Sequence, residues 1–116
     1  MFLQLNHKNL EAYKAARQFL IECYKVTKLL PSDEKYNLFQ QIRRAALSVK
    51  LNIAEGSSRK SEVERKRFYE ISRSSLVEID TAFESAFDLG YYNENDLNEL
   101  NKLINKTFAL ITGLIK

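Results

Sequence analysis

The chain has 116 residues, with 18 Lys and Arg against 15 Asp and Glu and a single cysteine. This length suits one domain over residues 1–116, in which folding buries roughly 65% of the unfolded surface. One cysteine excludes an internal disulfide and suits a reducing compartment, so we expect a cytoplasmic protein. No apolar run approaches the ~20 residues needed to cross a membrane, and residues 1–8 do not read as a signal peptide.

The first two helices are expected from apolar spacing and from residues that favour helix ends. The first is expected over residues 10–29 and stops before Pro31. The second is expected to begin after Ser32, whose hydroxyl suits an N-cap and is followed by two acidic residues. It is expected to end at Gly56, a residue suited to the left-handed position just past a helix.

The last two helices have clearer start signals. The third opens with a capping box, Ser61 and Glu64, and is expected to end at Gly90. The fourth opens after Asn93, with acidic residues near its positive end, and reaches about Leu114. Short links between long helices favour antiparallel neighbours. The sequence therefore predicts an all-α fold, an antiparallel up-down-up-down four-helix bundle.

A polar stripe marks the second helix, because Arg44, Ser48, Asn52 and Glu55 follow one another at spacings of four, four and three. The stripe lies beside an apolar face, where polar groups need partners. Small hydroxyls on the third helix can supply them, and Arg44, Arg67 or Arg73 can pair with the acidic residues. We expect a structural network, rather than a pair of catalytic carboxylates, made of Arg44, Ser48, Asn52, Glu55, Arg67, Ser72, Ser75 and Glu78.

Together, residues 44–56 of the second helix and residues 67–79 of the third resemble the four-helix bundle family of proteins encoded by intervening sequences in bacterial 23S rRNA genes. The matching positions are Ser48, residues 52–56, Arg59, Arg67, Phe68, Ser72, residues 74–76, Glu78 and residues 86–91. One departure is Ser74, where the family usually has glycine. The resemblance implies ring-forming homo-oligomers, apparently pentamers, with nucleic-acid binding as the role that relatives suggest.

Positive charge gathers in the middle of the chain. Residues 41–75 carry nine Lys and Arg against four Asp and Glu, whereas residues 76–116 carry three against seven. On charge alone, the simpler interpretation is that mixed charges solvate a helical protein. A loop and helix start rich in cations can also hold phosphates, through charge and free backbone N–H groups. The residues we expect to bind nucleic acid are Arg43, Arg59, Lys60, Arg65 and Lys66.

Enzymatic machinery is scarce in the sequence. His7 is the only histidine, and Cys23 lies on an apolar stripe with no histidine near it in sequence. Helical metal sites typically use Glu-x-x-His pairs, which this chain lacks. We therefore expect no catalytic residue, cofactor, metal or small-molecule substrate.

More apolar surface is present than one bundle core requires. A subunit interface is the interpretation we favour over scattered surface leucines, with contacts that include Phe19 or Leu51. The function that follows is a non-enzymatic homo-oligomer that binds RNA or DNA through backbone contacts, with no membrane role. The alternative is an oligomeric scaffold for protein–protein interactions with no nucleic-acid role.

Overall fold

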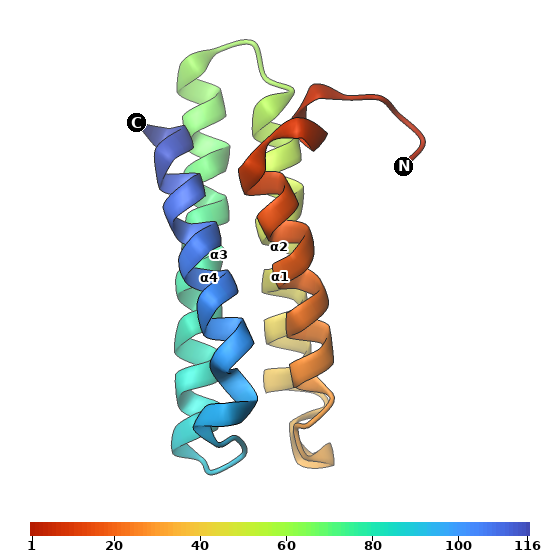
Figure 1. The fold of residues 1–116 in the computed structure, drawn as a ribbon, viewed down its shortest axis with the longest axis vertical. Helices are drawn as coiled ribbons and strands as arrows, with labels where there is room; N and C mark the ends of the chain where they lie inside the picture. The colour runs from red at the N-terminus through yellow and green to blue at the C-terminus, as the bar shows by residue number, and fades with distance from the viewer.

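A computed structural model describes all of residues 1–116. Its helices are α1 (Glu11–Thr27), α2 (Leu38–Ser57), α3 (Glu62–Asp88) and α4 (Glu94–Ile115), with short 3₁₀ turns at Asn6–Asn9 (η1) and Ser32–Glu34 (η2). Consecutive helices run in opposite directions along the long axis of the molecule (Figure 1). The prediction of an all-α four-helix bundle is confirmed.

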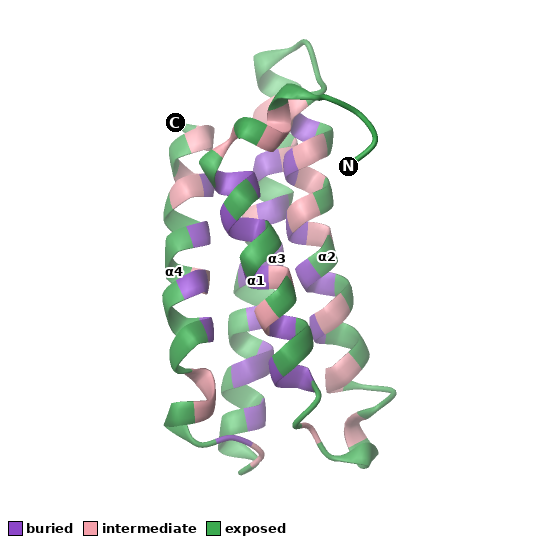
Figure 2. Cartoon of the chain, turned by 45° about the vertical axis from the view of Figure 1, so that its right-hand side comes forward, coloured by how far each residue is buried: buried purple, intermediate pink, exposed green.

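The core lies along the bundle axis, where each helix turns a buried stripe inward (Figure 2). Each helix packs against two neighbours, so the order around the axis is α1–α2–α3–α4. The largest fully buried side chains are Phe19, Ile42, Ile53, Leu76, Ile79 and Ile111. Phe19 is therefore a core residue, and the expectation that it contacts another subunit is wrong. Leu51 is 53% exposed and is free to contact another subunit.

Side-chain caps start α3 and α4, although only the serine half of the capping box predicted for α3 forms. The Ser61 hydroxyl accepts a hydrogen bond from the Glu64 N–H. Asn93 and Asp96 form a reciprocal capping box, in which each side chain accepts from the other residue's backbone N–H at 2.9 and 3.0 Å. After α3, Gly90 has a φ of +84°, which favours glycine. These caps confirm the predicted start of α4 and the turn that precedes it.

The second helix begins at Leu38, not directly after Ser32. Residues Ser32–Glu34 form a short 3₁₀ turn instead, and Asn37 is the N-cap of α2 without a side-chain capping hydrogen bond. The Glu34 carboxylate accepts from the Leu38 N–H at 3.5 Å and from the Asn37 amide at 3.2 Å. It also accepts from the hydroxyl of Tyr91 at 2.9 Å, which raises the pKa of Tyr91. The α1–α2 connection spans residues 28–37 and is longer than predicted.

Gly56 is not a left-handed cap; it lies inside α2 and is buried. A Cβ built there would lie 2.8 Å from Tyr69 Cε1, 3.0 Å from Phe68 Cβ and 3.1 Å from the Arg65 carbonyl oxygen. Glycine is needed because α3 approaches the backbone of α2 closely at this position. The helix continues to Ser57 and the chain turns at Ser58.

Candidate nucleic-acid interface

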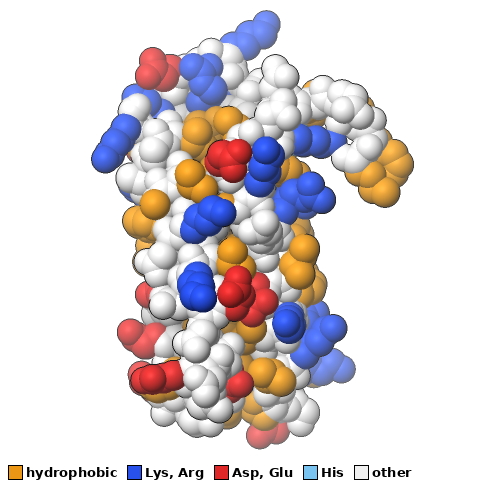
Figure 3. Space-filling view, viewed as in Figure 1, with side chains coloured by type: hydrophobic (Ala, Val, Ile, Leu, Met, Phe, Trp, Pro, Cys, Tyr) orange, Lys and Arg blue, Asp and Glu red, His pale blue; other side chains and the backbone are white.

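The candidate site lies at the end of the bundle where α2 meets α3. The loop over residues 58–61 and the first turns of α3 project from that end, and Lys and Arg side chains gather there at the top of Figure 3. Residues 58–67 contain five Lys and Arg against two Asp and Glu. We call the five cations of this segment the basic end: Arg59, Lys60 and Arg67 are exposed, and Arg65 and Lys66 are half-buried.

Arg65 holds the loop in shape through hydrogen bonds to its backbone. Its Nη1 donates to the backbone carbonyls of Arg59 at 3.1 Å and Lys60 at 2.7 Å. The Ser58 hydroxyl donates to the Glu55 carbonyl at 2.7 Å on the α2 side of the turn. Two consecutive carbonyls held by one guanidinium give the loop a defined shape. Arg65 is therefore a brace as well as a charge, a role that the sequence pattern did not reveal.

The other cations differ in how they are paired. Arg59 forms an ion pair with Glu55 at 2.9 Å and stacks over the Phe68 ring at 5.0 Å. Lys66 pairs with Glu62 at 3.2 Å. Both pairs are exposed, and such pairs are worth about 0–1 kcal/mol, so a phosphate can replace the carboxylate at low cost. Lys60 and Arg67 are exposed and form no ion pair.

Backbone donors add to the positive field at the start of α3. The N–H groups of the first helical turn have no intrahelical acceptor, and Ser61 caps only that of Glu64. The side chains of Glu62 and Glu64 occupy the same turn and oppose an incoming anion. The net positive charge of this end therefore comes from the five cations around them.

Arg43 lies away from the basic end, about 21 Å along α2 from Ser57 at ~1.5 Å per residue. Its Nε donates to the Thr27 hydroxyl and its Nη2 to the Tyr24 carbonyl, both at 2.9 Å. The guanidinium also lies over the rings of Tyr24 and Phe39, at 4.2 and 3.9 Å. The structure thus separates Arg43 from the other four expected binding residues, because it closes the C-terminal end of α1 against α2.

The structure brings together four members of the expected polar network. The Asn52 amide donates to the carbonyl and hydroxyl oxygens of Ser48 at 2.9 and 3.0 Å. The Ser75 hydroxyl crosses from α3 to the Ser48 hydroxyl at 3.1 Å. Nearby, the buried Ser72 hydroxyl donates to the Val49 carbonyl at 2.7 Å. These hydroxyls join α2 and α3 without any buried charge.

The charged members lie outside that network. Arg44 is exposed and donates to Gln41 on its own helix, and Glu55 pairs with Arg59 instead of an arginine across the interface. Arg67 and Glu78 are exposed and form neither a side-chain hydrogen bond nor an ion pair. Arg73, the remaining candidate cation, reaches Thr112 on α4. Charged side chains avoid the interface because solvent satisfies them better.

Cys23 and His7, the two side chains considered for catalysis, lie in different elements, α1 and η1. Cys23 is fully buried, and burial raises the pKa of its thiol. His7 lies in the η1 turn with its ring 4.8 Å from that of Tyr13 in an edge-on arrangement. No group of three or more His, Cys, Asp or Glu is placed to hold a metal ion. None of the helices has the length and apolar character required to span a bilayer.

Comparison with known proteins decides the family. The family model described as "23S rRNA-intervening sequence protein" matches residues 8–113. The chain belongs to this family. A search of curated proteins found no match. The fold is similar to the crystal structure of a protein of unknown function from the S23 ribosomal protein family of Bacteroides thetaiotaomicron, with a TM-score of 0.82 at 19% identity. That likeness covers 90% of this chain and 98% of the other, and at this identity it shows a shared fold and nothing more.

Proposed function

We propose that this intervening-sequence family member is a non-enzymatic, homo-oligomeric cytoplasmic protein that binds the backbone of RNA or DNA through its basic end. The observation that carries the proposal is the gathering of Arg59, Lys60, Lys66 and Arg67 on one braced loop and helix start. A pentamer is the assembly we expect from the family resemblance. Assembly would repeat the basic end in each subunit and so multiply weak contacts.

The expected binding mode is electrostatic and indifferent to sequence. Phosphate contacts position a protein on nucleic acid, whereas base-edge contacts give sequence specificity. The basic end has cations, and its only neighbouring aromatics are Phe68, half-buried beneath Arg59, and Tyr69, buried against Gly56. Stacking on single strands should therefore be minor. The logarithm of the affinity should fall with log salt by roughly 0.9 per phosphate contact on duplex DNA and about 0.7 on single strands.

The test is a charge reversal with a matched control. Arg59→Glu with Lys60→Glu should weaken binding to several unrelated RNA and DNA probes by similar factors and flatten the salt dependence. Lys102→Glu with Lys106→Glu makes the same change of charge on exposed positions of α4 and should have a much smaller effect. Equal losses in the two variants would mean that net charge, not the basic end, attracts the probe. No binding by the original protein at low salt would refute the proposal.

A second candidate is an oligomeric scaffold for other proteins, without a nucleic-acid role. The exposed apolar surface of α3 and α4, which includes Val77, Phe87 and Phe108, favours it. Absence of nucleic acid in material purified at low salt, together with retention of a protein partner, would support this candidate instead.

A further inference from the structure

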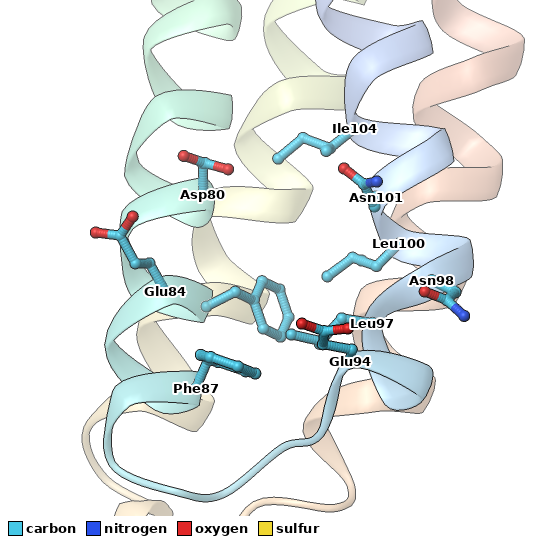
Figure 4. Close-up of a pocket in the computed structure, with 10 residues that line it drawn as sticks. Asp80, Glu84, Phe87, Glu94, Leu97, Asn98, Leu100, Asn101 and Ile104 are labelled. Carbon is cyan, nitrogen blue, oxygen red and sulfur yellow. The ribbon is translucent and has the colours of Figure 1, made fainter.

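A groove runs along the outside of the bundle between α3 and α4. Its larger part has a volume of about 410 Å³ and lies near the α3–α4 turn (Figure 4). A smaller part of about 240 Å³ continues toward the middle of the helices, and the two share Asp80 and Ile104. The groove is therefore one elongated depression and not an isolated pocket.

Half of the residues that line the larger part of the groove are apolar, and the polar half consists of three carboxylates and two asparagines. Side chains of Leu97, Leu100 and Ile104 reach into it from α4, while Asp80 and Glu84 stand along α3 in Figure 4. Glu94 adds a third carboxylate, and neither Lys nor Arg lines either part. None of the three carboxylates forms an ion pair within the chain. Phe87 and Phe108, at 42% and 40% exposed, add apolar surface to its edges.

The opposite pair of helices carries a surface of the complementary kind. Two stripes with helical spacing are exposed there and flank the Arg43–Tyr24 contact that joins α1 to α2. They consist of Arg17, Ile21 and Tyr24 on α1 with Lys28 directly after its end, and of Gln40, Arg44, Leu47 and Leu51 on α2. We call these eight residues the α1–α2 face. It holds three cations and five uncharged residues, with no Asp or Glu.

From these two surfaces we infer that the α3–α4 groove of one molecule binds the α1–α2 face of a second copy. The inference rests on the homo-oligomer in the proposed function and names the surfaces that would form it. Exposed apolar area on both sides supplies the driving force. Three unpaired carboxylates on one surface and three cations on the other give the orientation.

Such an interface is heterologous, because each molecule contributes a different surface to it. A contact of this kind leaves one free groove and one free face on every dimer, so further copies add head to tail. The chain of contacts either closes into a ring or grows as a filament. A two-fold dimer would instead bury the same surface on both molecules.

The test uses two complementary variants and their mixture. The groove variant carries Asp80→Lys and Glu84→Lys, and the face variant carries Arg17→Glu and Lys28→Glu. All four positions are exposed, so both variants should fold and give the circular dichroism of the original protein. Each alone should have the mass of one chain, 13.5 kDa, by light scattering. The mixture should assemble to at least twice that mass, because the groove variant keeps its face and the face variant keeps its groove. The two altered surfaces are also of opposite charge, so contacts between them can extend the assembly beyond a dimer.

The control variant with Lys102→Glu and Lys106→Glu should keep the assembled mass of the original protein. Three other outcomes would count against the inference. If the original protein is assembled and both charge-reversed variants assemble equally well, the inference fails but the proposed oligomer stands. Two monomeric variants whose mixture stays monomeric would also overturn the pairing of these two surfaces. A monomeric original protein at high micromolar concentration would overturn both, whatever its affinity for nucleic acid.

Discussion

The ring of Tyr69 lies against Gly56 so closely that a Cβ on Gly56 would approach its Cε1 to 2.8 Å. The Tyr69 hydroxyl is also 3.0 Å from the hydroxyl of Ser57, so the ring is held at both its edge and its tip. This contact packs α2 closely against α3 at Gly56, next to the loop that carries the basic end. The position of that loop therefore depends on the absence of a Cβ at Gly56.

Gly56→Ala should destabilise the protein even though alanine is the better helix former. The new methyl would meet the Arg65 carbonyl oxygen at 3.1 Å as well as the Tyr69 ring, and backbone moves less readily than a flexible side chain. Overpacking of this kind costs about 1–3 kcal/mol in the free energy of unfolding. Gly113→Ala is the matched control, since a Cβ at Gly113 meets nothing within 4 Å. That variant should be more stable by about 0.5–1 kcal/mol. Urea unfolding measures both, and a stabilised Gly56→Ala would contradict the contact.

Ser72→Ala should lower the free energy of unfolding by about 1 kcal/mol, through loss of the hydrogen bond to the Val49 carbonyl. Glu55→Ala should change it by less than that, because the Glu55–Arg59 pair is exposed. Denaturant melts of the two variants test the order. A larger loss from Glu55→Ala would mean that the carboxylate has a partner across the α2–α3 interface.

Arg43→Ala should destabilise the bundle by roughly 1–3 kcal/mol, because it removes charge-assisted hydrogen bonds to the end of α1. Arg43→Lys should not restore the lost stability, since an ammonium cannot make both hydrogen bonds while stacked between the rings of Tyr24 and Phe39. Neither change should alter the salt dependence of nucleic-acid binding as Arg59→Glu with Lys60→Glu does. Thermal melts and binding isotherms on the same samples separate the two roles. Full stability of Arg43→Lys would show that charge alone suffices.

His7 should titrate with a pKa below its usual 6.5, because burial and then the charge of Lys8 disfavour the imidazolium. The unfolded chain then binds the proton more readily than the folded one. The contribution of neutral His7 to stability is therefore present above about pH 6.5 and is lost as the pH falls through the lowered pKa. An NMR titration of the ring protons gives this pKa directly. Lys8→Ala should raise it, and a value at or above 6.5 in the original protein would contradict the prediction.

Local signals in the sequence predicted the helix ends where the capping groups are neighbours in the chain. Ser61 with Glu64, Asn93 with Asp96, and Gly90 all act within a few residues of one another. The predicted start of α2 was wrong, because the residues after Ser32 form a 3₁₀ turn and the helix begins at Leu38. Glu34 in that turn accepts a hydrogen bond from Tyr91, which is 57 residues away. No local pattern reports such a partner.

In the candidate site, too, the sequence showed the local features but not the contacts made between helices. The cluster of cations near residue 60 was visible in the sequence, but what each cation does was not. Arg43 is as basic as Arg59, yet its surroundings on α1 convert it into a structural clasp. Gly56 followed the usual composition of a helix end but is required by a helix that packs across it. In both cases the deciding neighbour comes from another helix.

The clasp that Arg43 makes has a consequence for the long connection between α1 and α2. The end of α1 is also held from the other side, because the Tyr92 hydroxyl donates to the Val26 carbonyl at 2.8 Å. The connection itself is exposed at Lys35 and Tyr36, and the contacts of Arg43 and Tyr92 hold the end of α1 independently of it. Exposed connections of this kind tolerate cuts and insertions. The molecule should therefore work as a split protein, in which residues 1–35 and 36–116 are made separately and reassemble.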